Sequence, residues 1–267
     1  MTETFATASA LVPAGERAFT WNVPDGWQQG RGAFGGLALG ALLRAMEACE
    51  PDTARRTRSL SGEIPAPLLP GATEIAVEVL RRGGGTTFLS ARALQGGTTV
   101  ARASALLAAA RPAGNARGGL TAPELPPAGD LAPVPPPAVG TMSPPFTRHY
   151  EYRAAPPYPY TGQAVAAANG WLRTREPLAA LDGPALIGLL DAWWPTALAC
   201  ETRPRPMATV TFTAELLADP AALDPAAPFA YRARLDGAGD GFTVEVRELW
   251  QDGRLVALNQ QVFAFLA

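Results

Sequence analysis

Asp191 is the residue of this sequence best suited to acid–base chemistry, because it is the one charged residue in the apolar segment 183–200. At about 100° per residue, Leu186, Leu190 and Trp193 share one stripe of a helix, and Asp191 lies on its flank. A carboxylate on a helix that is apolar nearly all round is paired, protonated or functional, since burying a lone charge is costly. Two interpretations stay open: a general base, or a structural aspartate satisfied by an arginine or a backbone amide.

The helix predicted over 183–200, with Pro195 as its kink or end, has an upstream counterpart over 35–49. Both segments begin with glycine, are apolar, end in Ala-Cys and are followed by glutamate. Setting Gly36 against Gly183 gives an offset of 183 − 36 = 147, which places Arg44 opposite Asp191. We infer a duplicated chain with one functional site.

Alternating apolar and polar residues predict strands around each helix, with glycine-rich turns between several of them. The expected strands are 17–23, 57–64, 74–81, 87–94, 100–108, 147–154, 164–175, 208–217, 229–235, 241–250 and 255–266. A stretch rich in proline, glycine and alanine separates the two series and reads as a linker. The domains predicted are residues 1–111, a linker at 112–145 and residues 146–267. A helix that an antiparallel sheet must bury indicates an α+β fold of the hotdog type, here two sheets, each wrapped around a central helix.

Composition narrows the function classes. A net charge of −2 without a basic block argues against nucleic acid as a partner. The sequence has no membrane-length apolar run and no secretion signal, so we expect no membrane span and a cytoplasmic location. With one histidine, His149, and two cysteines, Cys49 and Cys200, we expect neither metal nor cofactor, and no disulfide.

Several short motifs occur in a characteristic order along the chain. They are GRGAFGG at 30–36, Pro70-Gly71, TFLSAR at 87–92, Asp191, ATV at 208–210 and GRLVALNQQ at 253–261. Together they resemble the TesB-like acyl-CoA thioesterases, which have a double hotdog fold. The resemblance covers most of the chain. It implies an enzyme of fatty acid metabolism that hydrolyses acyl-CoA to free acid and CoA, and it leaves self-association into a homo-oligomer open.

The resemblance also implies the catalytic residues Asp191, Thr209 and Gln261. Alternation alone favours Gln260 as the buried glutamine, because Gln260 shares the more apolar face of its strand. We choose Gln261 on the family register and keep Gln260 as the alternative. On the preceding strand, alternation places Thr209, Thr211 and Thr213 on one face.

Gly35 and Gly36 are the predicted substrate-binding residues. Free N–H groups at the start of a helix could polarise a thioester carbonyl or bind a CoA phosphate, although glycine there also permits close helix packing. His149 is interpreted as structural, which disfavours a hotdog hydratase. The alternative function is a non-catalytic acyl-CoA or lipid-binding protein on the same scaffold.

Overall fold

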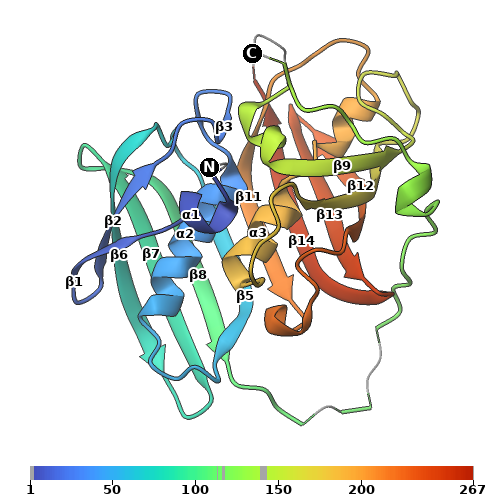
Figure 1. Cartoon of the computed structure of the whole chain (residues 1–267). Helices are drawn as coiled ribbons and strands as arrows, with labels where there is room; N and C mark the ends of the chain where they lie inside the picture. The colour runs from blue at the N-terminus through green and yellow to red at the C-terminus, as the bar shows by residue number, and fades with distance from the viewer. Residues whose placement is uncertain (1–2, 113, 116–117, 139–142, 267) are drawn as a thin grey trace.

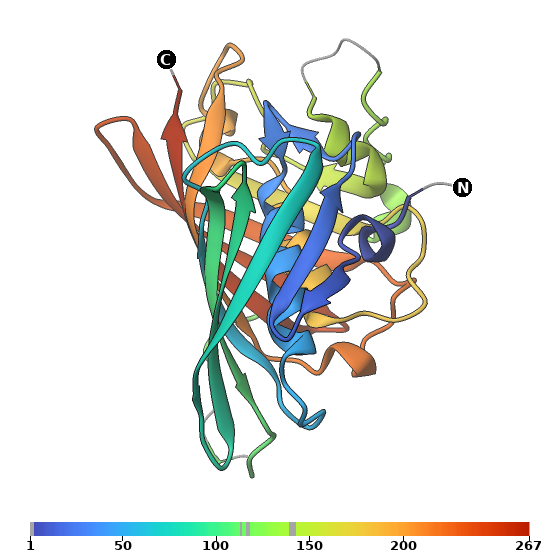
Figure 2. The same cartoon turned by 90° about the vertical axis from the view of Figure 1, so that its left-hand side faces the viewer.

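A computed structural model describes residues 3–112, 114–115, 118–138 and 143–266. Two central helices, α2 (Gly35–Ala48) and α3 (Gly183–Asp191), lie side by side against one face of a long, curved antiparallel sheet (Figure 1). Figure 2 shows the sheet curving around these helices. A short helix, α1 (Phe5–Ala8), packs against them from the N-terminus.

The sheet has twelve strands, six from each half of the chain. In spatial order the first six are β1 (Val12–Gly15), β2 (Ala18–Val23), β6 (Gly71–Arg82), β7 (Thr86–Gln95), β8 (Thr98–Ala108) and β5 (Arg56–Glu63). The other six are β11 (Met207–Leu216), β14 (Arg254–Phe265), β13 (Phe242–Gln251), β12 (Phe229–Gly239), β10 (Ala167–Thr174) and β9 (Tyr150–Ala155). Two short strands, β3 (Gln28–Gln29) and β4 (Gly32–Ala33), form a separate ribbon.

The two expected sheets are joined into one. Strand β5 pairs antiparallel with β11, with Ser61 opposite Thr213, so each half covers the other's open edge. An uncovered edge would expose a row of unpaired backbone groups, which favours this pairing. The predicted antiparallel strands around two central helices are present, but the strands form a continuous sheet.

The contacts of Phe5 show which residues of α2 and α3 occupy equivalent positions. A Cβ added at Gly40 would lie 2.8 Å from the Phe5 ring, and one added at Gly188 would lie 2.4 Å from it. These glycines are 188 − 40 = 148 residues apart, as are Gly35 and Gly183, the first residues of α2 and α3. The offset of 147 was therefore one residue short. Asp191 corresponds to Leu43, and Arg44 to the residue after Asp191.

The described part of the predicted linker runs along the second half of the sheet. The Val134 N–H donates to the Tyr152 carbonyl at 2.8 Å, and the Trp171 indole donates to the Pro126 carbonyl at 2.8 Å. Residues 113, 116–117 and 139–142 lie outside the described part of the chain. The strand expected from 147 begins at Tyr150 instead, because a 3-10 helix, Pro145–His149, precedes it.

Two shorter 3-10 helices, Ala128–Asp130 and Pro220–Ala222, lie in connecting segments, and a third, Thr196–Ala199, follows α3. Both cysteines are free, and Cys200 is exposed rather than buried. Within the described ranges, no helix is both long enough and apolar enough to cross a membrane.

Candidate active site

Asp191 is the last residue of α3, and its carboxylate is buried between the two central helices and strand β14. The Gly36 N–H donates to Asp191 Oδ2 at 2.6 Å. The Gln261 side-chain amide donates to Asp191 Oδ1 at 2.7 Å. Each carboxylate oxygen therefore has one donor from the protein, and an ionised carboxylate has further lone pairs with which it can accept a proton.

Helix α3 ends at Asp191 rather than at Cys200. The helix begins at an Asp182 cap, whose side chain accepts from the Ala185 N–H at 2.8 Å. At the other end, Arg247 Nη1 donates to the carbonyls of Leu190 and Asp191 at 3.2 and 3.4 Å. Carbonyls at a helix C-terminus lack donors within the helix, so a cation bound there stabilises the end. The chain then bends before Pro195 and continues as the Thr196–Ala199 helix.

Gly35 and Gly36 allow α2 to approach this carboxylate. A Cβ added at Gly35 would lie 2.8 Å from Asp191 Oδ2, and one at Gly36 would lie 2.9 Å from Asp191 Cβ. The close approach places the positive N-terminal end of the α2 dipole beside the negative charge. The Gly36 N–H is engaged by Asp191, and a role of these glycines in binding substrate stays a prediction.

Gln261, rather than Gln260, faces the helices. Gln261 is 0% exposed, whereas Gln260 is on the outer face and exposed. The Gln261 amide also lies 2.7 Å from Thr209 Oγ1, to which it donates. The structure thus brings together the three predicted catalytic residues, Asp191, Thr209 and Gln261. Alternation favoured Gln260 because β14 keeps Asn259 and Gln261 on its buried face.

A bulge in β11 separates Thr209 from the other threonines of that strand. Thr209 pairs with Phe263 and Thr211 with Val262, so one extra residue, Val210, interrupts the register. A bulge of this kind changes which face the following side chains occupy. Thr209 shares the inner face, while Thr211 and Thr213 lie on the outer one. The prediction that all three threonines face one way was therefore wrong.

Opposing influences act on the ionisation of Asp191. Burial raises the pKa of the Asp191 carboxyl above its usual value, and the Arg247 guanidinium, the Gln261 amide and the Gly36 N–H counteract this. Arg247 Nη1 lies 3.7 Å from Asp191 Oδ1, and the side chains are 0% and 2% exposed. Arg247 and its neighbour Glu245 were not predicted as site residues, because both alternate along β13 with valines and the pattern allowed either face to be buried.

Unpartnered polar atoms and aromatic rings surround this carboxylate. Gln261 Oε1 is buried and makes no hydrogen bond to any described residue, and the same holds for the Tyr150 hydroxyl. The Phe34 ring lies 6.1 Å from that of Tyr150, and the Tyr152 ring lies 5.5 Å from that of Trp193. Apart from the Arg247–Glu245 pair, the neighbouring side chains are largely aromatic, and one acceptor next to the Asp–Gln pair is left unused among the described residues.

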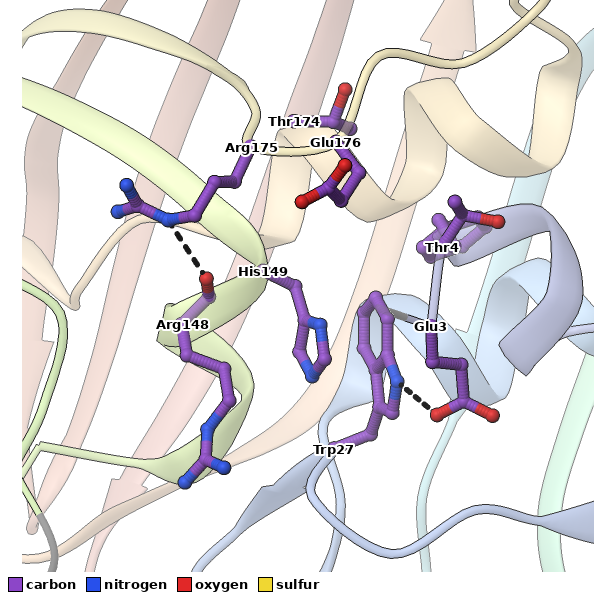
Figure 3. Close-up of a pocket in the computed structure, with 9 residues that line it drawn as sticks. Glu3, Thr4, Trp27, Arg148, His149, Thr174, Arg175 and Glu176 are labelled. Carbon is purple, nitrogen blue, oxygen red and sulfur yellow. Dashed lines mark hydrogen bonds between the residues drawn. The ribbon is translucent and has the colours of Figure 1, made fainter. Parts of the chain in front are cut away.

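His149 is involved in packing at a separate pocket (Figure 3). Its ring stacks on Trp27 with centroids 3.8 Å apart, and Nε2 lies 3.1 Å from the Gly26 carbonyl oxygen. The Trp27 indole donates to Glu3 at 2.9 Å. Burial lowers the pKa of His149. These contacts agree with a structural role.

The described residues contain no group of three or more histidine, cysteine, aspartate or glutamate side chains arranged to hold a metal ion. The Asp191 site is built from one carboxylate, one amide and one hydroxyl, and these groups favour chemistry with water and protons.

Comparison with known proteins gives the fold and the family. A conserved protein of unknown function with a hot dog fold, from Alicyclobacillus acidocaldarius, superposes with a TM-score of 0.90 at 27% identity, covering 100% of this chain and 99% of the other. A Thermobifida fusca protein proposed to be a thioesterase II gives 0.84 at 24% identity, covering 98% and 97%. The tesB protein of Mycobacterium avium subsp. paratuberculosis gives 0.80 at 14% identity, covering 98% of both chains. These likenesses show a hotdog fold. No match was found among curated protein sequences.

Two family models match the sequence itself. Residues 23–108 match the acyl-CoA thioesterase N-terminal domain, and residues 123–265 match the acyl-CoA thioesterase C-terminal domain. The two matches are in the order that the structure gives to the two halves of the sheet, and they include Gly36, Asp191, Thr209 and Gln261. The chain belongs to the acyl-CoA thioesterase family.

Proposed function

We propose that this protein hydrolyses an acyl-CoA thioester to a free acid and CoA, with Asp191 as the general base that activates water, on two tandem hotdog units. The observation that carries the proposal is the convergence of Asp191, Gln261 and Thr209, joined by hydrogen bonds of 2.7 Å through the Gln261 amide. Family membership supports acyl-CoA as the substrate.

The hydrogen bonds indicate what each group can do. Thr209 Oγ1 accepts from Gln261, so its own proton is free to be donated to water or to a developing oxyanion. Gln261 Oε1 has no partner among the described residues and can accept a hydrogen bond from water. A water molecule held by these groups would lie next to Asp191, which would take one of its protons.

The reaction balances with these groups alone. As the oxygen of the activated water bonds to the thioester carbonyl carbon, one O–H bond breaks and its proton moves to Asp191, while the carbonyl π pair moves onto oxygen to give the oxyanion. When the oxyanion re-forms the carbonyl, the bond between carbon and sulfur breaks, and Asp191 gives its proton to the leaving sulfur, which yields the free acid and the CoA thiol. A positioned base of this kind contributes a rate factor of about 10² to 10⁴.

The decisive experiment measures release of free CoA thiol from acyl-CoAs of increasing chain length. We expect turnover by the native protein and a loss of about 100-fold or more in Asp191→Asn, since the variant keeps the side-chain shape but not the base. Gln261→Ala should also be impaired, whereas Gln260→Ala, its exposed neighbour on the same strand, serves as the matched control. Full activity in Asp191→Asn would refute the mechanism.

Binding measurements separate this function from the alternative. If acyl-CoA bound saturably but the native protein released no thiol from any chain length, the protein would be a non-catalytic acyl-CoA-binding protein on the same scaffold.

A further inference from the structure

Strand β13 places two opposite charges inside the protein. Arg247 and Glu245 are each 0% exposed, and Arg247 Nε donates to Glu245 Oε1 at 2.6 Å. Such a buried pair is weak evidence for a role in stability, because desolvation offsets much of the attraction between its members. Its position beside the Asp191 site suggests another role.

Arg247 contacts Asp191 through both the backbone and the side chain. Its Nη1 group donates to the carbonyls of Leu190 and Asp191, and it lies 3.7 Å from Asp191 Oδ1. One guanidinium therefore binds the end of helix α3 and faces the carboxylate that the last residue of the helix carries.

Glu245 fixes Arg247 and the chain that follows Asp191. Its Oε1 accepts from Arg247, and its Oε2 accepts from the Thr196 N–H at 2.7 Å and from the Thr196 hydroxyl at 2.6 Å. The bend between Asp191 and Thr196 is thereby held at both ends by adjacent inward-facing residues of one strand. Two tyrosine hydroxyls add to this, since Tyr231 donates to the Leu190 carbonyl and Tyr152 to the Ala192 carbonyl.

We propose that Arg247 is a positioning residue for the thioesterase reaction, which holds the Asp191 carboxylate and the end of α3 in place, and that Glu245 positions Arg247 in turn. The inference rests on the proposed function, because it assigns Asp191 the role of base.

The charged groups around Asp191 determine in which direction the pKa of its carboxyl would move if one of them were removed. Within the described chain, five elements carry the groups that bind the Asp191 carboxylate or act on its charge. They are Gly36 N–H from α2, Gln261 from β14, Tyr150 and Tyr152 from β9, Tyr231 from β12, and Arg247 with Glu245 from β13. The tyrosines are neutral, since burial raises their pKa values. Arg247 lowers the pKa of Asp191, and Glu245 raises it.

The test is the pH dependence of kcat for CoA release, measured for the native protein, Arg247→Met and Glu245→Gln. A general base works in its ionised form, so kcat falls on the acid side of its pKa. Loss of the guanidinium should move this acid limb up by about 1 to 3 pH units, the usual effect of an opposite charge at this distance. Loss of the Glu245 charge should move the acid limb of kcat to lower pH. If Arg247 and Glu245 had a purely structural role, the two variants would lose activity, but their acid limbs would not shift in opposite directions.

A double variant covers the case in which Arg247→Met leaves Glu245 as an unpaired buried charge and does not fold. In Arg247→Met/Glu245→Gln both charges are gone, and the limb should move up by less than in the single arginine variant. An unmoved limb, or shifts of the same sign in both single variants, would overturn the positioning role. Activity retained in Asp191→Asn would instead overturn the proposed function.

Discussion

Glu47 is expected to make stability fall as the pH rises through neutrality. It lies near the end of α2, where the Thr57 hydroxyl donates to Glu47 Oε1 at 2.6 Å. The start of α3 lies close to the Glu47 side chain, since a Cβ added at Gly183 would lie 2.7 Å from Glu47 Oε1. Burial is the main cause that raises the pKa of Glu47 from 4.5 to about 7, and the negative charge of Asp182 adds to it.

The difference between the pKa of Glu47 in the folded protein and in the unfolded chain sets the sign and the size of the change in stability with pH. Between pH 4.5 and pH 7 the folded protein holds a proton on Glu47 that the unfolded chain has lost, so unfolding becomes easier as the pH rises. A difference of 2.5 pKa units at 1.36 kcal/mol per unit corresponds to up to about 3 kcal/mol, and partial exposure of Glu47 to water reduces it.

Glu47→Gln tests this reasoning. Glutamine keeps an acceptor for Thr57 and has no charge, so the variant should be more stable than the native protein at pH 8 and nearly equal to it below pH 5. Urea unfolding at both pH values gives the two free energies of unfolding. Glu50→Gln is the matched control. Burial raises the pKa of Glu50, but hydrogen bonds from Thr87, the Asp52 N–H and Arg82 outweigh it and lower that pKa, so loss of the carboxylate should destabilise the protein near neutral pH. A stability difference between Glu47→Gln and the native protein that did not change with pH would refute the argument.

Three further substitutions test the packing and the site. Gly36→Ala adds a Cβ 2.9 Å from Asp191 Cβ, so thiol release should fall steeply, and unchanged activity would contradict the close approach of α2. Gly188→Ala adds a Cβ 2.4 Å from the Phe5 ring and should cost about 1 to 3 kcal/mol in thermal unfolding. In the Phe5→Ala background the same substitution should cost less, and an equal cost in both backgrounds would reject the contact. Thr209→Val keeps the side-chain shape and removes the hydroxyl that accepts from Gln261, so kcat should fall about 10- to 100-fold with the fold intact.

The sequence predicted the elements and the motif residues better than the side-chain directions. The alternating strands and the two glycine-led apolar helices were identifiable, because their periods reflect burial on one face. Asp191, Thr209 and Gln261 were predicted from the order of family motifs, and the structure brings their side chains together, whereas no local pattern distinguishes Gln261 from Gln260. Gln261 lies inside because Asp191 and Thr209 satisfy its amide there, and such a contact spans 70 residues in sequence.

Backbone irregularities account for the remaining errors. The β11 bulge at Val210 reverses the faces of Thr211 and Thr213, and a single extra residue of this kind leaves no periodic signal. Arg247 and Glu245 alternate with Val244 and Val246, so the pattern allowed either pair to be buried. The structure places the charged pair inside, because its partners on α3 and in the Thr196 turn lie there.

The first half of the chain retains part of the same arrangement. Leu60 pairs with Ala105 as Phe212 pairs with Gln261, and the bulges after Thr57 and Thr209 match, so 212 − 60 = 152 places Thr57 at the position of Thr209. Two donors are missing there. Ala105 replaces the glutamine, and Pro184, at 36 + 148, has no N–H to replace that of Gly36.

The Asp191 site uses both halves of the chain. Asp191, Thr209 and Gln261 come from the second half, but the backbone donor to Asp191 Oδ2 comes from Gly36 of the first. A buried carboxylate without that donor would have its charged form disfavoured further, since Gly36 is among the groups that lower its pKa. The ionised base that the proposed reaction needs therefore depends on the contact between α2 and α3.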